Sequence, residues 1–316
     1  MCNILKVIFA GTPVFAACHL EVLINQYPVV GVLTQPDKYH GRGNRLVFSP
    51  VKQLALENNL PLLQPECLME KNLQEQIKNL NADIMVVVAY GKILPQAVLD
   101  LPKFGCINIH ASLLPKWRGA APIQRSLCAG DIETGITTIK MNTNIDTGDI
   151  LHTIHCKIEN TDTTATLYDK LSKLGSMSML ATLKQFATGT TCPVKQSKHN
   201  ISYATKISKQ ESRIDWSFSA IKIERYIRAF NPWPGSYFMV KNQIIRVWKA
   251  SIIDSILSHS SQPGEILQAN QYGIKIATSN GVLNIEELQT AGRKVMKVRE
   301  FLKSKREWFI PGDIIN

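Results

Sequence analysis

The stretch "ADIMVVVAYG", residues 82–91, is apolar along almost its whole length. A continuous apolar run of this length is typical of a strand that is covered on both faces, as in a parallel sheet. Similar runs occur at residues 6–11 ("KVIFAG") and 28–35 ("PVVGVLTQ"), and helix-like segments lie between the runs. Strands that alternate with helices predict an α/β domain with a Rossmann-like, mostly parallel sheet and right-handed crossovers.

The second part of the chain has a different pattern. After a helix-like segment at residues 219–228, short strand-like runs follow that Gly and Asn punctuate, at residues 244–250, 264–269, 272–278 and 281–288. Such runs predict a small β-barrel of the oligonucleotide-binding (OB) type. We therefore expect a sheet domain over residues 1–205, with a linker from about residue 190, and an OB-like β-barrel domain over residues 206–316.

Composition narrows the class of protein. The chain has 316 residues, of which 45% are hydrophobic, and its seven cysteines show no C-x-x-C spacing. This cysteine pattern indicates a reducing compartment and predicts no metal site. No apolar run approaches the roughly 18–20 residues of a membrane span. We expect a cytoplasmic protein without a membrane partner.

Positive charge is concentrated in the second part. The formal net charge is +11, and residues 206–316 hold 17 basic and 10 acidic residues, against 19 and 15 in residues 1–205. A surplus of this kind attracts polyanions, nucleic acid above all. Solubility alone would also explain it, so charge by itself leaves both interpretations open.

The segment "GCINIHASLLP", residues 105–115, contains the first candidate site residues. It ends a predicted strand at the edge where open α/β sheets bind ligands. Asn108 and His110 are two residues apart, so their side chains share one side of the strand. An amide and a protonated imidazole can both donate hydrogen bonds to a developing oxyanion, and a neutral imidazole can accept a proton. An Asn-x-His pair also arises by chance, and a capped strand end would explain it.

A third group comes from the loop "NTNIDTGD", residues 142–149, which offers Asp146 or Asp149. Because this loop joins two predicted strands, Asp146 could lie against His110, orient the imidazole and favour its protonated form. Amide, imidazole and carboxylate together suit acyl transfer in which the substrate supplies the nucleophile. The segment around Gly11 lacks G-x-G-x-x-G, so we expect no nicotinamide cofactor (NAD).

Several stretches resemble the methionyl-tRNA formyltransferase family, within the wider group of 10-formyltetrahydrofolate-dependent formyltransferases. They extend over nearly the whole chain: "FAGTPVFA" (9–16), "TQPDKYHGRG" (34–43), "NIHASLLPKWRGAAPI" (108–123), "IDTGD" (145–149), "KISKQESRIDW" (206–216), "RAFNPWPGSYF" (228–238), "GVLNIEELQTAGRKVM" (281–296) and "REWFIPGD" (306–313). The N-x-H-x-S-L-L-P and D-T-G-D motifs are shared by the wider group, so they indicate the chemistry and not the acceptor.

The resemblance implies a one-carbon transferase for translation initiation. The co-substrate would be 10-formyltetrahydrofolate, and the acceptor would be the α-amino group of methionine on initiator tRNA, with no metal and no NAD. Asn108 and His110 would stabilise the oxyanion that forms when the amine attacks. Asp146 would hold His110 charged and help to move the proton. We expect the protein to act as a monomer.

The resemblance also implies binding residues. Four residues would line the folate site: Ser112, Leu113, Leu114 and Pro115. Arg42 matches an arginine in a loop that orders against the tRNA acceptor end, and Lys38 and Arg45 would add phosphate contacts. A solvated surface loop is the plainer interpretation of this segment.

Two alternatives to a methionyl-tRNA acceptor stay open. One is a formyltransferase that acts on a nucleotide-linked amino sugar or on glycinamide ribonucleotide. The other is a nucleic-acid-binding protein with an inert sheet domain, which would have no need of Asn108, His110 and Asp146.

Overall fold

The computed structural model describes residues 4–40, 45–253 and 261–315, and it divides into two compact units. The sheet unit comprises the described residues up to Pro122 together with Glu133–Lys157 and Tyr168–Ala204. The C-terminal unit comprises Ile123–Ile132, Ile158–Leu167 and the described residues from Thr205 onward.

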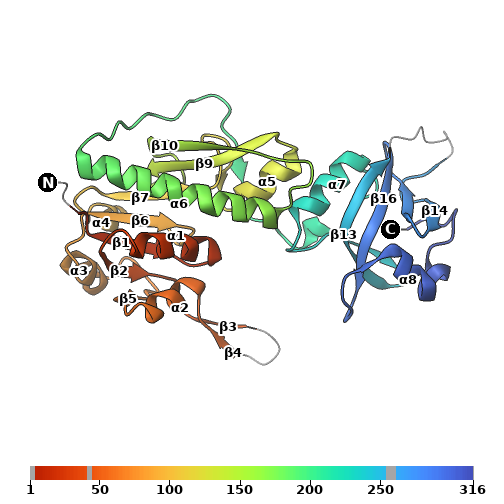
Figure 1. Cartoon of the computed structure of the whole chain (residues 1–316), viewed down its shortest axis with the longest axis horizontal. Coiled ribbons are helices and arrows are strands. Elements are labelled where there is room, and N and C mark those ends of the chain that lie inside the picture. The colour runs from red at the N-terminus through yellow and green to blue at the C-terminus, as the bar shows by residue number, and fades with distance from the viewer. Residues whose placement is uncertain (1–3, 41–44, 254–260, 316) are drawn as a thin grey trace. The chain divides into compact units, whose positions relative to one another are not determined.

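A seven-stranded sheet forms the centre of the sheet unit (Figure 1). Its strands are β1 (Val7–Gly11), β2 (Val29–Leu33), β5 (Leu62–Leu63), β6 (Ile84–Val88), β7 (Cys106–His110), β9 (Glu133–Lys140) and β10 (Ile150–Lys157). The order is β10-β9-β7-β6-β1-β2-β5, parallel from β7 to β5 and antiparallel at β9 and β10. Every residue of β1 and β6 is buried, which explains the continuous apolar sequence.

Helices connect the strands and cover the sheet. Those of the sheet unit are α1 (Val14–Ile24), α2 (Pro50–Glu57), α3 (Lys71–Asn79), α4 (Gln96–Leu99) and most of α6 (Thr164–Thr188), whereas α5 (Pro122–Ala129) belongs almost wholly to the C-terminal unit. The start of α2 is fixed by Ser49, whose hydroxyl accepts the Lys52 N–H, and by Pro50 at the first helical position. Within the sheet unit α6 runs beside α1, where the Tyr168 hydroxyl lies 2.6 Å from the Phe15 nitrogen (Figure 1).

Two short pairs of strands lie outside the main sheet. β3 (Lys38–His40) and β4 (Arg45–Val47) form an antiparallel hairpin in a segment for which we expected a loop. β8 (Arg118–Gly119) pairs in parallel with β11 (Tyr203–Ala204). The second pair matters for the site, because it brings the chain that follows α6 back to the end of β7.

The C-terminal unit is built on a curled antiparallel sheet of order β12-β13-β16-β15-β14, with β17 paired to β16. Its elements are α7 (Ala220–Ala229), β12 (Tyr237–Val240), β13 (Gln243–Ile253), β14 (Ile266–Asn270), β15 (Gly273–Ala277), β16 (Val282–Thr290), β17 (Met296–Lys297) and α8 (Val298–Lys305), with short 3₁₀ turns at Gln210–Ser212 and Arg306–Trp308. One core of strand isoleucines and packed aromatic rings, including Phe238 and Phe309, lies inside this sheet. A mostly parallel Rossmann-like sheet followed by a curled antiparallel sheet confirms the predicted fold class.

Within the described ranges, no helix has both the length and the apolar character needed to cross a membrane.

Candidate active site

The end of β7 brings three polar side chains together. Asn108 Nδ2 donates a hydrogen bond of 3.1 Å to Asp146 Oδ1. His110 Nδ1 lies 3.6 Å from Asp146 Oδ2, and both side chains are largely buried, with 7% and 13% of their surface exposed. The parallel pairing of β6 with β7 and the antiparallel pairing of β7 with β9 set the position of this strand end. The two strand residues therefore face the same carboxylate, as their spacing predicts.

The Asp146 carboxylate is held from a second direction. Its Oδ2 accepts the Gly119 N–H at 2.8 Å, so the carboxylate receives hydrogen bonds from a side-chain amide and from the backbone. Asp146 adopts a left-handed backbone conformation (φ +51°), which a non-glycine residue adopts only at an energetic cost. The other acid of the motif, Asp149, contributes its backbone carbonyl, which accepts the Lys140 N–H.

Gly148 allows the loop to approach β9 closely. A Cβ atom at this position would collide with the carbonyl oxygen of Lys140. The glycine in "DTGD" therefore has a steric role, since no other residue fits between the loop and the strand without a shift of the backbone.

The second nitrogen of His110 faces the backbone. His110 Nε2 lies 2.9 Å from the Trp117 carbonyl oxygen, which can only accept, so Nε2 carries the hydrogen. Nδ1 faces a carboxylate, which is also an acceptor when ionised. Only an imidazole with hydrogens on both nitrogens can donate toward both groups. Trp117 itself has a left-handed backbone (φ +63°), and its N–H donates to Ser202 Oγ at 2.9 Å.

The residues expected at the folate site form a tight turn after β7. Ser112 is fully buried, and its hydroxyl donates to the Lys116 carbonyl at 2.6 Å. Thr137 on β9 fixes the turn, because its hydroxyl donates to the Ser112 carbonyl and accepts the Leu114 N–H. The Leu114–Pro115 peptide bond is cis.

The Ser112 hydroxyl forms its hydrogen bond within this turn. Leu113 and Pro115 stay partly exposed, while Leu114 is buried. An apolar ligand surface from this turn would therefore come from Leu113 and Pro115.

The three basic residues expected at a tRNA surface are placed unequally. Lys38 is exposed on β3, and its ammonium donates to Gln35 Oε1 at 3.2 Å. Arg45 belongs to β4, but its side chain is outside the described part of the structure. Arg42 lies outside the described residues altogether.

Sequence reasoning missed three residues that surround Asp146. Gly119 and Trp117 belong to the quoted stretch "KWRGAAPI", but no residue pattern there assigns them a role. The third is Gln196, in the segment after α6, whose amide donates to the carbonyls of Asp146 and Gly148. A polar residue in a polar segment carries no signal of such a contact.

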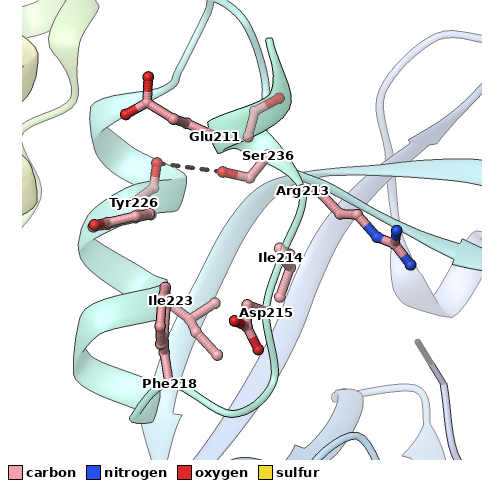
Figure 2. Close-up of a pocket in the computed structure, with 9 residues that line it drawn as sticks. Glu211, Arg213, Ile214, Asp215, Phe218, Ile223, Tyr226 and Ser236 are labelled. Carbon is pink, nitrogen blue, oxygen red and sulfur yellow. Dashed lines mark hydrogen bonds between the residues drawn. The ribbon is translucent and has the colours of Figure 1, made fainter. Parts of the chain in front are cut away.

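A separate hollow occurs in the C-terminal unit beside α7 (Figure 2). Several of its polar side chains are bound within the unit. The Ser236 hydroxyl donates to the Tyr226 carbonyl, and the Asp215 carboxylate accepts from Ser217. Glu211 pairs with Arg125, which keeps the pKa of that carboxyl below its ordinary value. With these groups satisfied, the hollow is a weaker candidate site than the end of β7.

Comparison with known proteins places the chain in a family. The profile of the family described as formyl transferase matches residues 2–183, and the profile of the formyl transferase C-terminal domain matches residues 206–306. Over the described residues, no group of three or more His, Cys, Asp or Glu side chains could hold a metal ion.

Three solved structures illustrate the similarity of fold. The sugar 3N-formyl transferase WlaRD, solved with dTDP and 5-N-formyl-THF, has a TM-score of 0.66 and 19% identity, over 92% of this chain and all of that one. An N-formyltransferase from Helicobacter canadensis, solved with folinic acid and dTDP-3-aminofucose, has a TM-score of 0.68 and 18% identity, over 90% and 99% of the two chains. Methionyl-tRNA formyltransferase from Clostridium thermocellum has a TM-score of 0.55 and 19% identity, over 80% and 95%.

At these sequence identities the solved structures show only a shared fold, whereas the family profiles show membership of the family. The first profile alone covers more than half of the chain, and the second covers most of the remainder. The protein belongs to the formyl transferase family.

Proposed function

We propose that this chain transfers the formyl group of 10-formyltetrahydrofolate to the α-amino group of methionyl-initiator tRNA. Family membership supports formyl transfer, and the solved relatives bound to 5-N-formyl-THF or folinic acid support a folate donor. In this proposal the residues up to about 205 carry the chemistry, and residues 206–316 bind tRNA.

The observation that carries the choice of acceptor is a basic surface on the C-terminal unit. Between the end of β16 and Glu307, which lies just beyond α8, six exposed basic side chains accompany only two exposed acids. The basic residues are Arg293, Lys294, Lys297, Arg299, Lys303 and Arg306. A polyanion releases its counterions when it binds such a surface, and this release favours binding. A small sugar nucleotide does not need a basic surface of this kind. A nucleic-acid acceptor accounts for this charge and for its position in the second domain.

The proposed reaction begins when the neutral methionyl amine attacks the formyl carbon. The carbonyl oxygen becomes an oxyanion, and the bond from the formyl carbon to the folate nitrogen then breaks. The proton that the attacking nitrogen loses ends on the leaving nitrogen. Protein groups must therefore stabilise one negative oxygen and move one proton.

Asn108, His110 and Asp146 can meet both needs. Asn108 donates one amide hydrogen to Asp146 and keeps a second for the oxyanion. A His110 ring with hydrogens on both nitrogens can turn the Nε2 donor from the Trp117 carbonyl to the oxyanion. Asp146 faces Nδ1, so its carboxylate can orient the ring and help the proton to pass from the attacking amine to the leaving folate nitrogen.

An amino-sugar nucleotide is the second candidate acceptor. It is favoured by the two sugar N-formyltransferases, whose structures match this chain at TM-scores of 0.66 and 0.68 over at least 90% of its length. Such an enzyme would use the same three residues, so the acceptor must be decided by assay.

The proposal is tested by mixing the protein with 10-formyltetrahydrofolate and one of three acceptors: methionyl-tRNA, uncharged tRNA or a dTDP-linked amino sugar. We expect formylated product with methionyl-tRNA alone. Replacing Arg299 and Lys303 together by glutamate should raise the KM for tRNA at least tenfold and reduce its salt dependence. Formylation of the amino sugar in place of methionyl-tRNA would overturn the choice of acceptor.

A further inference from the structure

The segment that follows α6 reaches back to the active site. Val194 pairs with Ile150 at the start of β10, and β11 pairs with β8, so residues 194–204 lie along the sheet unit. Gln196 is half-buried between these two attachment points. A connecting segment would need no such contacts if its only role were to join two domains.

Gln196 uses both ends of its side-chain amide. Nε2 donates to the carbonyls of Asp146 and Gly148, each at 2.8 Å. Oε1 accepts from Nε and Nη2 of Arg118, at 3.2 and 2.6 Å. The positively charged guanidinium polarises the amide, which strengthens the two bonds that its NH₂ group donates.

These contacts act on a loop that needs support. Asp146 has a left-handed backbone, which the surrounding structure must maintain. The Gln196 amide holds the backbone on both sides of Thr147, and the Gly119 N–H holds the carboxylate. Arg118 and Gly119 are neighbours in β8, so one short strand anchors both contacts to Asp146.

We propose that Gln196 is a positioning residue, which sets the place of the Asp146 carboxylate against His110 through the backbone of the loop. This inference rests on the role of Asp146 in the proposed function. Gln196 does not touch the carboxylate or the imidazole in the described structure, so its effect must pass through the loop. A displacement of about 1 Å in such a group can cost roughly 100-fold in turnover.

The first test is kinetic. Gln196→Met keeps the length of the side chain and removes all four hydrogen bonds. We expect kcat to fall about 30- to 100-fold, while the KM values for both substrates change less than threefold. The matched control is Gln76→Met, at an exposed position on α3, which should leave kcat unchanged. A kcat for Gln196→Met within twofold of wild type would overturn the proposal.

A double variant separates positioning from a general loss of structure. In the Asp146→Ala background, Gln196→Met should lower kcat by less than twofold further, because the group that it positions is already absent. If Gln196→Met lowered kcat by the same factor in the Asp146→Ala background as in the wild type, Gln196 would act independently of Asp146. That result would overturn the proposal. Gln196→Glu is the second single variant. It keeps an acceptor for Arg118 but places a carboxylate oxygen, which cannot donate, against the two loop carbonyls. We therefore expect kcat to fall again.

The third test does not depend on the acceptor. Amide hydrogen exchange, followed by mass spectrometry on peptides that cover residues 141–149, should become at least tenfold faster in Gln196→Met and stay unchanged in Gln76→Met. Unchanged exchange would overturn the inference, whatever the wild-type activity. Failure of the wild type to formylate methionyl-tRNA, with the exchange result as expected, would reject only the proposed function.

Discussion

Two segments hold Asp146, and they differ in how much their sequences reveal. The first, residues 105–119, contains the mostly buried strand β7 and the turn after it, and its Asn108 and Gly119 both donate to the carboxylate. The second, residues 189–204, is a polar stretch whose sequence predicts only a linker, yet Gln196 within it holds the Asp146 loop. The types and spacing of Asn108 and Asp146 predict a chemical role from the sequence, whereas the contacts that Gly119 and Gln196 make with Asp146 are seen only in the folded chain.

The largest effects should come from the side chains that carry chemistry. We expect His110→Ala, Asn108→Ala and Asp146→Ala each to lower kcat at least about 100-fold, because loss of an oxyanion donor or of positioned proton transfer costs about that much. Circular dichroism and thermal unfolding should show folded proteins. Near-normal turnover by His110→Ala would contradict its assigned role.

The next largest effect tests a steric contact. Gly148→Ala forces a Cβ atom against the Lys140 carbonyl and should shift the Asp146 loop, so we expect kcat to fall roughly tenfold or more. Gly189→Ala, just after α6, is the control in the second segment. Nothing lies within 4 Å of a Cβ there, so its left-handed backbone (φ +68°) should cost about 1 kcal/mol of stability and no activity. Equal loss of kcat in both variants would contradict this explanation.

His19 extends the comparison from activity to stability. His19 lies on α1 and is completely buried. Its Nδ1 donates to the Phe15 carbonyl, and Nε2 has no partner among the described residues. Burial lowers the pKa of His19 from 6.5 to about 4, so the unfolded chain binds a proton over this range and the folded chain does not. The contribution of neutral His19 to the free energy of unfolding is therefore fully present above pH 6.5. It is lost as the pH falls toward 4, and the loss is about 3 kcal/mol at most.

The measurement is urea unfolding at a series of pH values. The wild type should lose stability between pH 6.5 and 4, and His19→Leu should lose about 3 kcal/mol less over the same interval. Parallel curves for the two proteins would mean that His19 titrates alike in both states.

The smallest effect should come from the basic residues of the segment 38–45. Arg42→Ala should raise the KM for methionyl-tRNA by about threefold to tenfold, the size of one or two phosphate contacts, and leave the KM for 10-formyltetrahydrofolate unchanged. Lys38→Ala should act in the same direction and more weakly. Equal damage to both KM values would place these residues at the folate site instead.

The same contrast explains how far the sequence predicts the fold. Apolar runs predicted β1, β2 and β6, because a strand covered on both faces is mostly apolar, and the segment that contains Asn108 and His110 was predicted as the end of a further strand, β7. β5, β8 and β11 are two residues long, too short for any periodicity, and their existence depends on the strands beside them.

The candidate site was predictable to the same degree. The spacing of Asn108 and His110 placed them on one side of β7, and the "DTGD" loop suggested the carboxylate. The roles of Trp117 and Gln196 were not predictable, because a backbone carbonyl or a linker amide gains its role only where the chain folds back on itself.

The contact between the His110 ring and the Trp117 carbonyl bears on side reactions. In the resting enzyme the Nε2 hydrogen is already shared with the chain, so water that attacks a bound formyl group gains little from it. In the proposed mechanism, binding of the acceptor would position the donor so that its formyl oxygen competes with the Trp117 carbonyl for that hydrogen. If His110 acts as proposed, release of formate from the bound donor should therefore be slow in the absence of the acceptor amine.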